Sequence, residues 1–179
     1  MYLQLKEYPD IASTDSKITD TTLQSYLEDL SDSDLTEYLL DEKVLLKYVK
    51  VLDIRQKSSI SSCCFTKAYT HYAEGTGSVL QHDSNQLLEE QYSKYIDSDD
   101  ISYLKGLQLR YFTPREVANL MGFPMNFSFP DSMSNKTKYR LLGNSLNIKV
   151  VAMLYRILMR EWIHFVVLMN TLHLIDLFF

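Results

Sequence analysis

YRLLGNSLNIKVVAMLYRIL, at Tyr139–Leu158, places a glycine, two amides and a hydroxyl between a basic segment and a long apolar run. After this cluster, apolar residues recur at helical spacing: Ile148, Val151, Ala152, Tyr155 and Leu158. Gly143 could end a preceding helix, but a C-cap does not explain why Asn144 and Ser145 follow it. Asn and Ser are favoured where a helix begins. The sequence therefore predicts a turn at Gly143 that opens a helix running to Leu158.

A second helix is predicted upstream, because TPREVANLMGFP carries both start and stop signals. Thr113 suits the N-cap and Pro114 the first helical position, and Glu116 completes a capping box. Gly122 is placed to end the helix. The following residues, 125–140, are predicted as a loop with three basic side chains.

The first eighty residues predict shorter elements. Apolar residues at helical spacing favour a helix over 23–30, and Asp41 is placed to cap another over 42–52. Residues 59–80 are rich in Ser, Thr, Cys and aromatic residues, which favours strands or an extended loop. Within them, Gly75-Thr76-Gly77 indicates a turn or a close backbone approach. A mixed α+β fold follows from these patterns.

The charge distribution is uneven along the chain. Residues 1–50 hold 11 acidic and 5 basic residues, a net of −6, whereas residues 101–160 hold 9 basic and 2 acidic residues, a net of +7. The later segment is therefore the one that could meet a polyanion. Scattered surface charge is the alternative interpretation.

The cysteines and the two ends of the sequence indicate the cellular compartment of the chain. Cys63 and Cys64 are adjacent, so they form neither a disulfide framework nor a zinc-site spacing. The N-terminus shows no signal-peptide pattern. The uncharged stretch Trp162–Ile175 is shorter than the roughly 20 residues that a spanning helix needs, so a buried or partner-facing helix is expected and a membrane segment is not. We expect a cytoplasmic or nuclear location.

Three motifs resemble those of the cytosine-C5 methyltransferases. TPREVANLMGFP resembles the ninth conserved motif of that family, and YRLLGNSLN resembles the tenth. SSCCFTKAYTHYAEGTGSVL resembles the Cys-Phe-Thr segment of its eukaryotic tRNA-modifying members, the type-two DNA methyltransferase homologues. The likeness extends over about residues 23–158.

The resemblance implies a domain plan. A polar lead-in over 1–22 would precede a small target-recognition domain over 23–140. The turn and helix at 141–158 would return to a Rossmann-like α/β methyltransferase domain, most of which lies outside this chain. The apolar tail, 159–179, has no counterpart in the family and is expected to be helical.

The resemblance also implies a reaction and a site. Family members transfer a methyl group from S-adenosylmethionine to a cytosine in the tRNA anticodon loop, at position 38. Three residues of the tenth motif would contact that cofactor: Asn144, Ser145 and Leu146. The alternative is that Asn144 and Ser145 only cap a helix. Six residues would contact the RNA: Cys64, Thr66, Lys67, Lys136, Lys138 and Arg140. Tyr69 and Tyr72 could stack on bases.

The chain contains no Pro-Cys pair, the motif that provides the family's nucleophile, and no Phe-x-Gly-x-Gly for the cofactor. No catalytic residue and no metal ligand is therefore assigned, and the chain alone is expected to be inactive, as the C-terminal part of an enzyme whose N-terminal domain is a partner. Two alternatives stay open: a non-catalytic RNA-binding or interaction module, and a fragment of a DNA cytosine-C5 methyltransferase.

Overall fold

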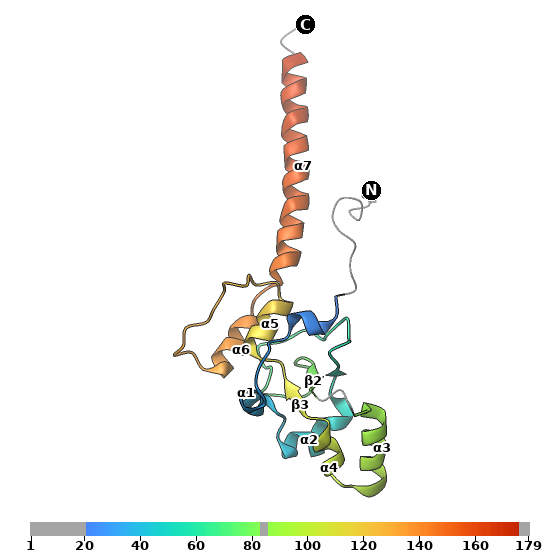
Figure 1. Cartoon of the computed structure of the whole chain (residues 1–179). Coiled ribbons are helices and arrows are strands. Elements are labelled where there is room, and N and C mark those ends of the chain that lie inside the picture. Colours follow the sequence, from blue (N-terminus) through green and yellow to red (C-terminus); the bar gives the residue numbers. More distant parts are fainter. Residues whose placement is uncertain (1–20, 83–85, 176–179) are drawn as a thin grey trace.

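The computed structural model describes residues 21–82 and 86–175, so the expected lead-in lies outside it except for residues 21 and 22. Figure 1 shows a body of short helices and strands from which one long helix, α7, projects. The described part is a mixed α+β structure, as the sequence predicts.

A small sheet of three strands forms the centre of the body. β1 (Ile54–Arg55) pairs in parallel with β2 (Val79–Gln81), and β2 pairs antiparallel with β3 (Leu109–Tyr111). Successive side chains of a strand point to opposite faces. Val79 and Leu80 therefore enter two different apolar clusters, one on each side of β2.

These two clusters form the core. One includes Tyr69, Leu80, Phe112 and Tyr139, and it packs against the helices that follow β3. The other gathers buried leucines and valines around the helices at the opposite end, namely Leu40, Leu45, Val49, Val79, Leu104, Leu107 and Leu109, together with Tyr95.

The helices before β3 are short. The helix expected over 23–30 is wrong in extent, because only one 3₁₀ turn, η2 (Leu23–Tyr26), forms there. The segment over 42–52 divides into α2 (Glu42–Tyr48) and the 3₁₀ turn η4 (Val49–Val51). The remaining elements are α1 (Asp32–Leu35), η3 (Thr36–Tyr38), α3 (Leu88–Ser98) and α4 (Ser102–Gly106).

The helix predicted from the capping box is confirmed as α5 (Pro114–Leu120), with Thr113 as its N-cap. The loop predicted for 125–140 is wrong at its end, because α6 (Asn135–Gly143) begins after Ser134, whose side chain accepts a hydrogen bond from the Thr137 amide. Gly143 is thus the last residue of one helix and does not open the next.

α7 (Ile148–Ile175) is 28 residues long and continues through most of the predicted tail. It leaves the body at its first turn and extends away from it (Figure 1). By length and composition alone, one described stretch, Asn135–Trp162, could cross a membrane. That stretch contains the break between α6 and α7, as well as exposed Lys136 and Arg140, which weakens this interpretation.

Candidate functional site

The start of α5 is held by a buried ionic network. Arg110 and Glu116 are 1% and 0% exposed and form a two-pronged pair, with Nη1 to Oε2 at 2.7 Å and Nη2 to Oε1 at 2.8 Å. The Thr113 amide donates to Glu116 at 2.8 Å, and the Thr113 hydroxyl donates to the Glu28 carboxylate. The network joins Glu28, on the segment after η2, to β3 and α5, so it fixes the position of the helix whose sequence resembles the ninth motif.

The three basic residues that were predicted to contact RNA lie on two different faces of α6. Lys136, Arg140 and Gly143 stand at i, i+4 and i+7, which places them on one face. Lys136 and Arg140 are exposed. Lys138 lies toward the opposite side, where its Nζ is 5.8 Å from the centre of the Phe129 ring. Phe129 also lines an apolar hollow of about 250 Å³ beside the loop that connects α5 to α6.

The C-terminal end of α6 packs against the Cys-Phe-Thr segment. A Cβ atom at Gly143 would overlap the Thr66 carbonyl group and the Lys67 amide nitrogen, both backbone groups. Thr66 is half-buried and Lys67 is exposed. The fold thus brings together two groups of residues that the sequence assigns to RNA, one from residues 64–67 and one from α6.

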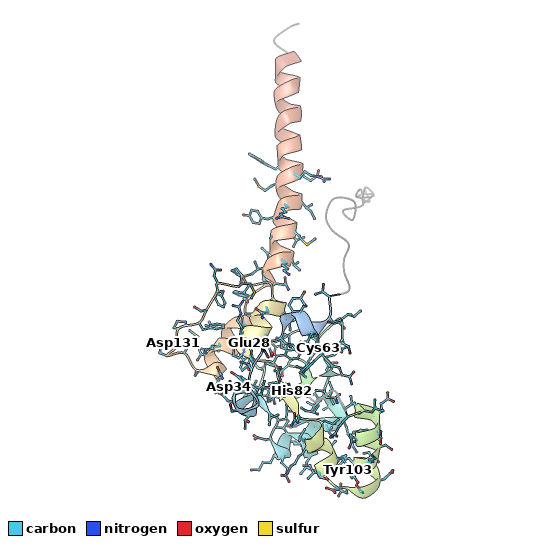
Figure 2. All side chains as sticks on the ribbon, in the orientation of Figure 1. Glu28, Asp34, Cys63, His82, Tyr103 and Asp131 are labelled. Carbon is cyan, nitrogen blue, oxygen red and sulfur yellow. The ribbon has the colours of Figure 1, made fainter. Side chains whose placement is uncertain are left out.

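Cys63 and Cys64 are both exposed, on the segment before Phe65, and Cys63 is labelled in Figure 2. The Cys63 amide donates to the Ser78 hydroxyl at 2.7 Å, and that hydroxyl in turn donates to Asp53. The hydrogen bond with Asp53 raises the pKa of the Cys63 thiol, which disfavours the nucleophilic thiolate. Cys64 is exposed, as an RNA contact requires.

Tyr69 is not available for stacking on a base, so that prediction is wrong. It is 3% exposed, its hydroxyl donates to the Ser78 carbonyl at 2.6 Å, and the same hydroxyl accepts from the Phe112 amide at 2.9 Å. Burial raises its pKa well above the usual value. Tyr72, by contrast, is 60% exposed.

The turn over 144–147 carries the residues assigned to the cofactor. The Asn144 amide nitrogen bonds to the end of α6, but its side chain is exposed and has no hydrogen bond to the described residues. Leu146 is 74% exposed. The Ser145 hydroxyl donates to the Leu142 carbonyl at 2.9 Å, so it is partly committed to capping α6. Asn144 and Leu146 are therefore free to contact a ligand.

Asn147 is a structural residue of this turn that the sequence prediction omitted. Its Nδ2 donates to the Leu120 carbonyl at 3.2 Å, and its Oδ1 accepts from the Val150 amide at 3.2 Å. The Ile148 amide also donates to the Met121 carbonyl at 2.8 Å. The available signal was an Asn directly before an apolar helix. These bonds tie the start of α7 to the end of α5.

Other candidate chemistry is sparse in the described part of the chain. Among the side chains that the structure describes, no group of His, Cys, Asp and Glu is arranged to hold a metal ion. A second hollow, of about 390 Å³, is lined mainly by acidic and polar side chains of α1, η3 and the segment before α1, including Glu28, Asp34 and Glu37.

Comparison with known proteins agrees with the motifs. Residues 3–160 match the model of the family described as C-5 cytosine-specific DNA methylase. The human tRNA (cytosine(38)-C(5))-methyltransferase is 48% identical over 147 residues, which are 80% of this chain and 37% of that protein. A DNA (cytosine-5)-methyltransferase of Dictyostelium discoideum is 41% identical over 132 residues, 73% of this chain and 33% of that protein.

Among solved structures, the Dnmt2 methyltransferase of S. pombe superimposes with a TM-score of 0.70 at 38% sequence identity. The match covers 85% of this chain and 45% of that one. The chain thus spans about two fifths of the length of the relatives it matches.

Proposed function

Because this chain belongs to the C-5 cytosine-specific DNA methylase family, we propose that it forms the substrate-recognition part, and one wall of the cofactor site, of a tRNA cytosine-38 C5-methyltransferase. The observation that carries this proposal is the contact at Gly143. It joins the segment that carries Cys64, Thr66 and Lys67, assigned to RNA, to the turn that carries the residues assigned to the cofactor, Asn144, Ser145 and Leu146.

Charge and exposure support RNA recognition. Lys67, Lys136 and Arg140 are exposed cations on neighbouring elements, where they can bind phosphates. Cys64 is exposed and Thr66 half-buried on the segment that leads to Lys67, and they could contact a base that is displaced from the loop. Lys138 is set apart from this group by its contact with Phe129, so it would contribute less.

The free side chains of the turn support a place at the cofactor. S-adenosylmethionine would supply the methyl group. The Asn144 amide can both donate and accept, which suits the polar amino-acid end of that molecule, and exposed Leu146 offers an apolar contact. The Ser145 hydroxyl oxygen can accept a hydrogen bond while its O–H still donates to the Leu142 carbonyl.

The chain on its own would bind RNA without modifying it. In complete family members a cysteine after a proline attacks the cytosine ring, and this chain has no such pair. We therefore expect no transfer of radiolabelled methyl groups from S-adenosylmethionine to tRNA by the purified chain. Methylated tRNA in that assay would contradict the proposed division of roles.

The binding test uses a tRNA transcript and a range of salt concentrations. Affinity should fall steeply with salt, because phosphate contacts release counterions. Arg140→Ala and Lys136→Ala should each lower the slope of log affinity against log salt by about one. Lys43→Ala, an exposed lysine of α2, is the matched control and should leave the slope unchanged. Equal slopes for all variants would refute RNA binding at α6.

DNA is the second candidate substrate, and the Dictyostelium relative named as a DNA methyltransferase favours it. The same titration with a DNA duplex separates the two. We expect tighter binding of tRNA, because the Cys-Phe-Thr segment resembles that of the tRNA-modifying members. Tighter binding of the duplex would favour the DNA enzyme. A module that only binds RNA would bind tRNA as tightly. In such a module, Asn144→Ala would not change the response to S-adenosylmethionine.

A further inference from the structure

Gly143 occupies a position where no side chain fits. A Cβ atom there would lie 2.5 Å from the Thr66 carbonyl oxygen and overlap the Thr66 carbonyl carbon and the Lys67 nitrogen. All three are backbone atoms, so they cannot rotate away as the end of a side chain can. The other glycine within a described helix, Gly106, differs in this respect, because a Cβ there would meet only the flexible side chain of Gln86.

The opposing peptide is itself held from the far side. The Thr66 amide donates to the Thr76 carbonyl at 2.9 Å, and the Tyr69 amide donates to the Thr66 carbonyl at 3.0 Å. Gly77, next to Thr76, lies equally close to Tyr69 and Phe65, because its own Cβ would be 2.7 Å and 2.8 Å from their rings. The Thr66–Lys67 peptide therefore cannot retreat from α6 without disturbing the buried aromatic cluster.

This contact sets where Lys67 stands. Gly143 shares a face of α6 with Lys136 and Arg140, so the peptide it touches brings the backbone of Lys67 to the end of that face. The turn that begins with Asn144 follows directly. One backbone contact thus aligns cations from two segments that are about seventy residues apart in the sequence.

We propose that Gly143 is a positioning residue for RNA binding: it allows α6 to lie directly on the Thr66–Lys67 peptide, so that Lys67, Arg140 and Lys136 form one phosphate-binding row beside Asn144. This inference rests on the proposed function. It assigns to Gly143 an effect on RNA through Lys67, without any contact between Gly143 and the RNA.

The test is a double-mutant cycle on the full chain, with tRNA affinity measured by fluorescence anisotropy. Gly143→Ala displaces the peptide, so the Kd should rise roughly tenfold, about as much as for Lys67→Ala. Gly143→Ala in the Lys67→Ala background should have little further effect, because both changes remove the same phosphate contact. Each variant should also lower the salt slope by about one, which a loss of folded protein does not do.

Gly106→Ala is the matched control and should leave both Kd and salt slope unchanged. An unchanged Kd for Gly143→Ala, or additive effects in the double variant, would overturn the inference. If Lys67→Ala, Lys136→Ala and Arg140→Ala all leave tRNA binding unchanged, the proposed function fails instead, so the two failures are distinguishable.

Hydrogen exchange on the unaltered chain keeps the inference testable if Gly143→Ala does not fold. If the contact at Gly143 couples the two segments, bound tRNA should slow exchange of the Thr66 amide and of the Ser145 amide together. Protection of Thr66 alone would show that the contact does not couple them.

Discussion

At the scale of single residues, Glu116 has the largest structural role in the ninth motif. Its carboxylate is fully buried, pairs with both terminal nitrogens of Arg110 and accepts from the Thr113 and Glu28 amides. Removing its charge would leave Arg110 buried and unpaired. Glu116→Gln should therefore lower the free energy of unfolding by about 3–5 kcal/mol, measured by urea denaturation.

Glu90→Gln is the matched control for that experiment. Glu90 forms an exposed i,i+4 pair with Lys94, at 2.6 Å, and such surface pairs contribute only about 0.3–0.5 kcal/mol. Comparing the losses of unfolding free energy in the two variants separates the effect of burial from the effect of charge pairing alone. Equal losses for the two variants would show that the network at α5 is open to water.

Asp53 predicts a pH dependence. Burial raises the pKa of its carboxyl, but hydrogen bonds from Arg55 and Ser78 outweigh burial and lower it from 3.8 to about 2. Because the folded pKa is depressed, the stabilisation is present above pH 3.8 and is lost as the pH falls toward about 2. Asp53→Asn should be less stable than the unaltered chain at pH 7. The difference in unfolding free energy, measured by urea denaturation at each pH, should shrink as the pH falls through that acid range.

Asp97→Asn, an exposed position on α3, is the control for Asp53. Acid weakens many proteins through other carboxyls, so only the difference between variant and unaltered chain is informative. If the difference in unfolding free energy between Asp53→Asn and the unaltered chain stays constant down to pH 2, the substitution acts through packing and not through the lost charge of Asp53.

At the scale of elements, the sequence predicted α5 well and α6 poorly, for different physical reasons. The Thr113–Glu116 box is local, because both of its hydrogen bonds lie within one turn. α6 has no such signal beyond Ser134, and it depends on long-range burial of Tyr139 and Leu142. Gly143 was expected to open a turn because glycine often does. Its actual role depends on a peptide distant in sequence, which no local pattern reveals.

The junction of α5 and α7 should depend on Asn147 more than on its neighbours. Asn147→Ala removes the bond to the Leu120 carbonyl and the cap on Val150. Asn147→Asp keeps the cap and loses only the donor. Exchange of the Ile148 amide, which donates to Met121, should therefore be fastest in the Ala variant and intermediate in the Asp variant, as measured by hydrogen exchange.

Asn144→Ala, in the same turn, should leave that exchange rate unchanged because its side chain has no bond to the described residues. Faster exchange in Asn144→Ala than in Asn147→Ala would contradict this assignment of structural and ligand-facing roles within the turn.

At the scale of the whole molecule, the candidate site could be predicted by residue type but not by arrangement. The basic residues of 101–160 were identified from charge alone, and most are exposed. Their division by α6 into one row and the separate Lys138 follows from a helix that the sequence did not predict. Tyr69 was misassigned because an aromatic residue beside a lysine has the same pattern whether it stacks on a base or fills a core.

The long helix determines how the chain behaves in isolation. Side chains along the first half of α7 extend into open space (Figure 2), and Leu154, Leu158 and Trp162 are 55%, 65% and 60% exposed. A continuous apolar surface of this kind binds a partner or self-associates. The purified chain should therefore form oligomers in light scattering, and Leu154→Gln with Leu158→Gln should shift it toward monomer while the body still melts cooperatively. Leu46→Gln, an equally exposed leucine on α2, should leave the oligomers intact. A monodisperse monomer from the unaltered chain would show that α7 is covered in solution by some other part of the same molecule.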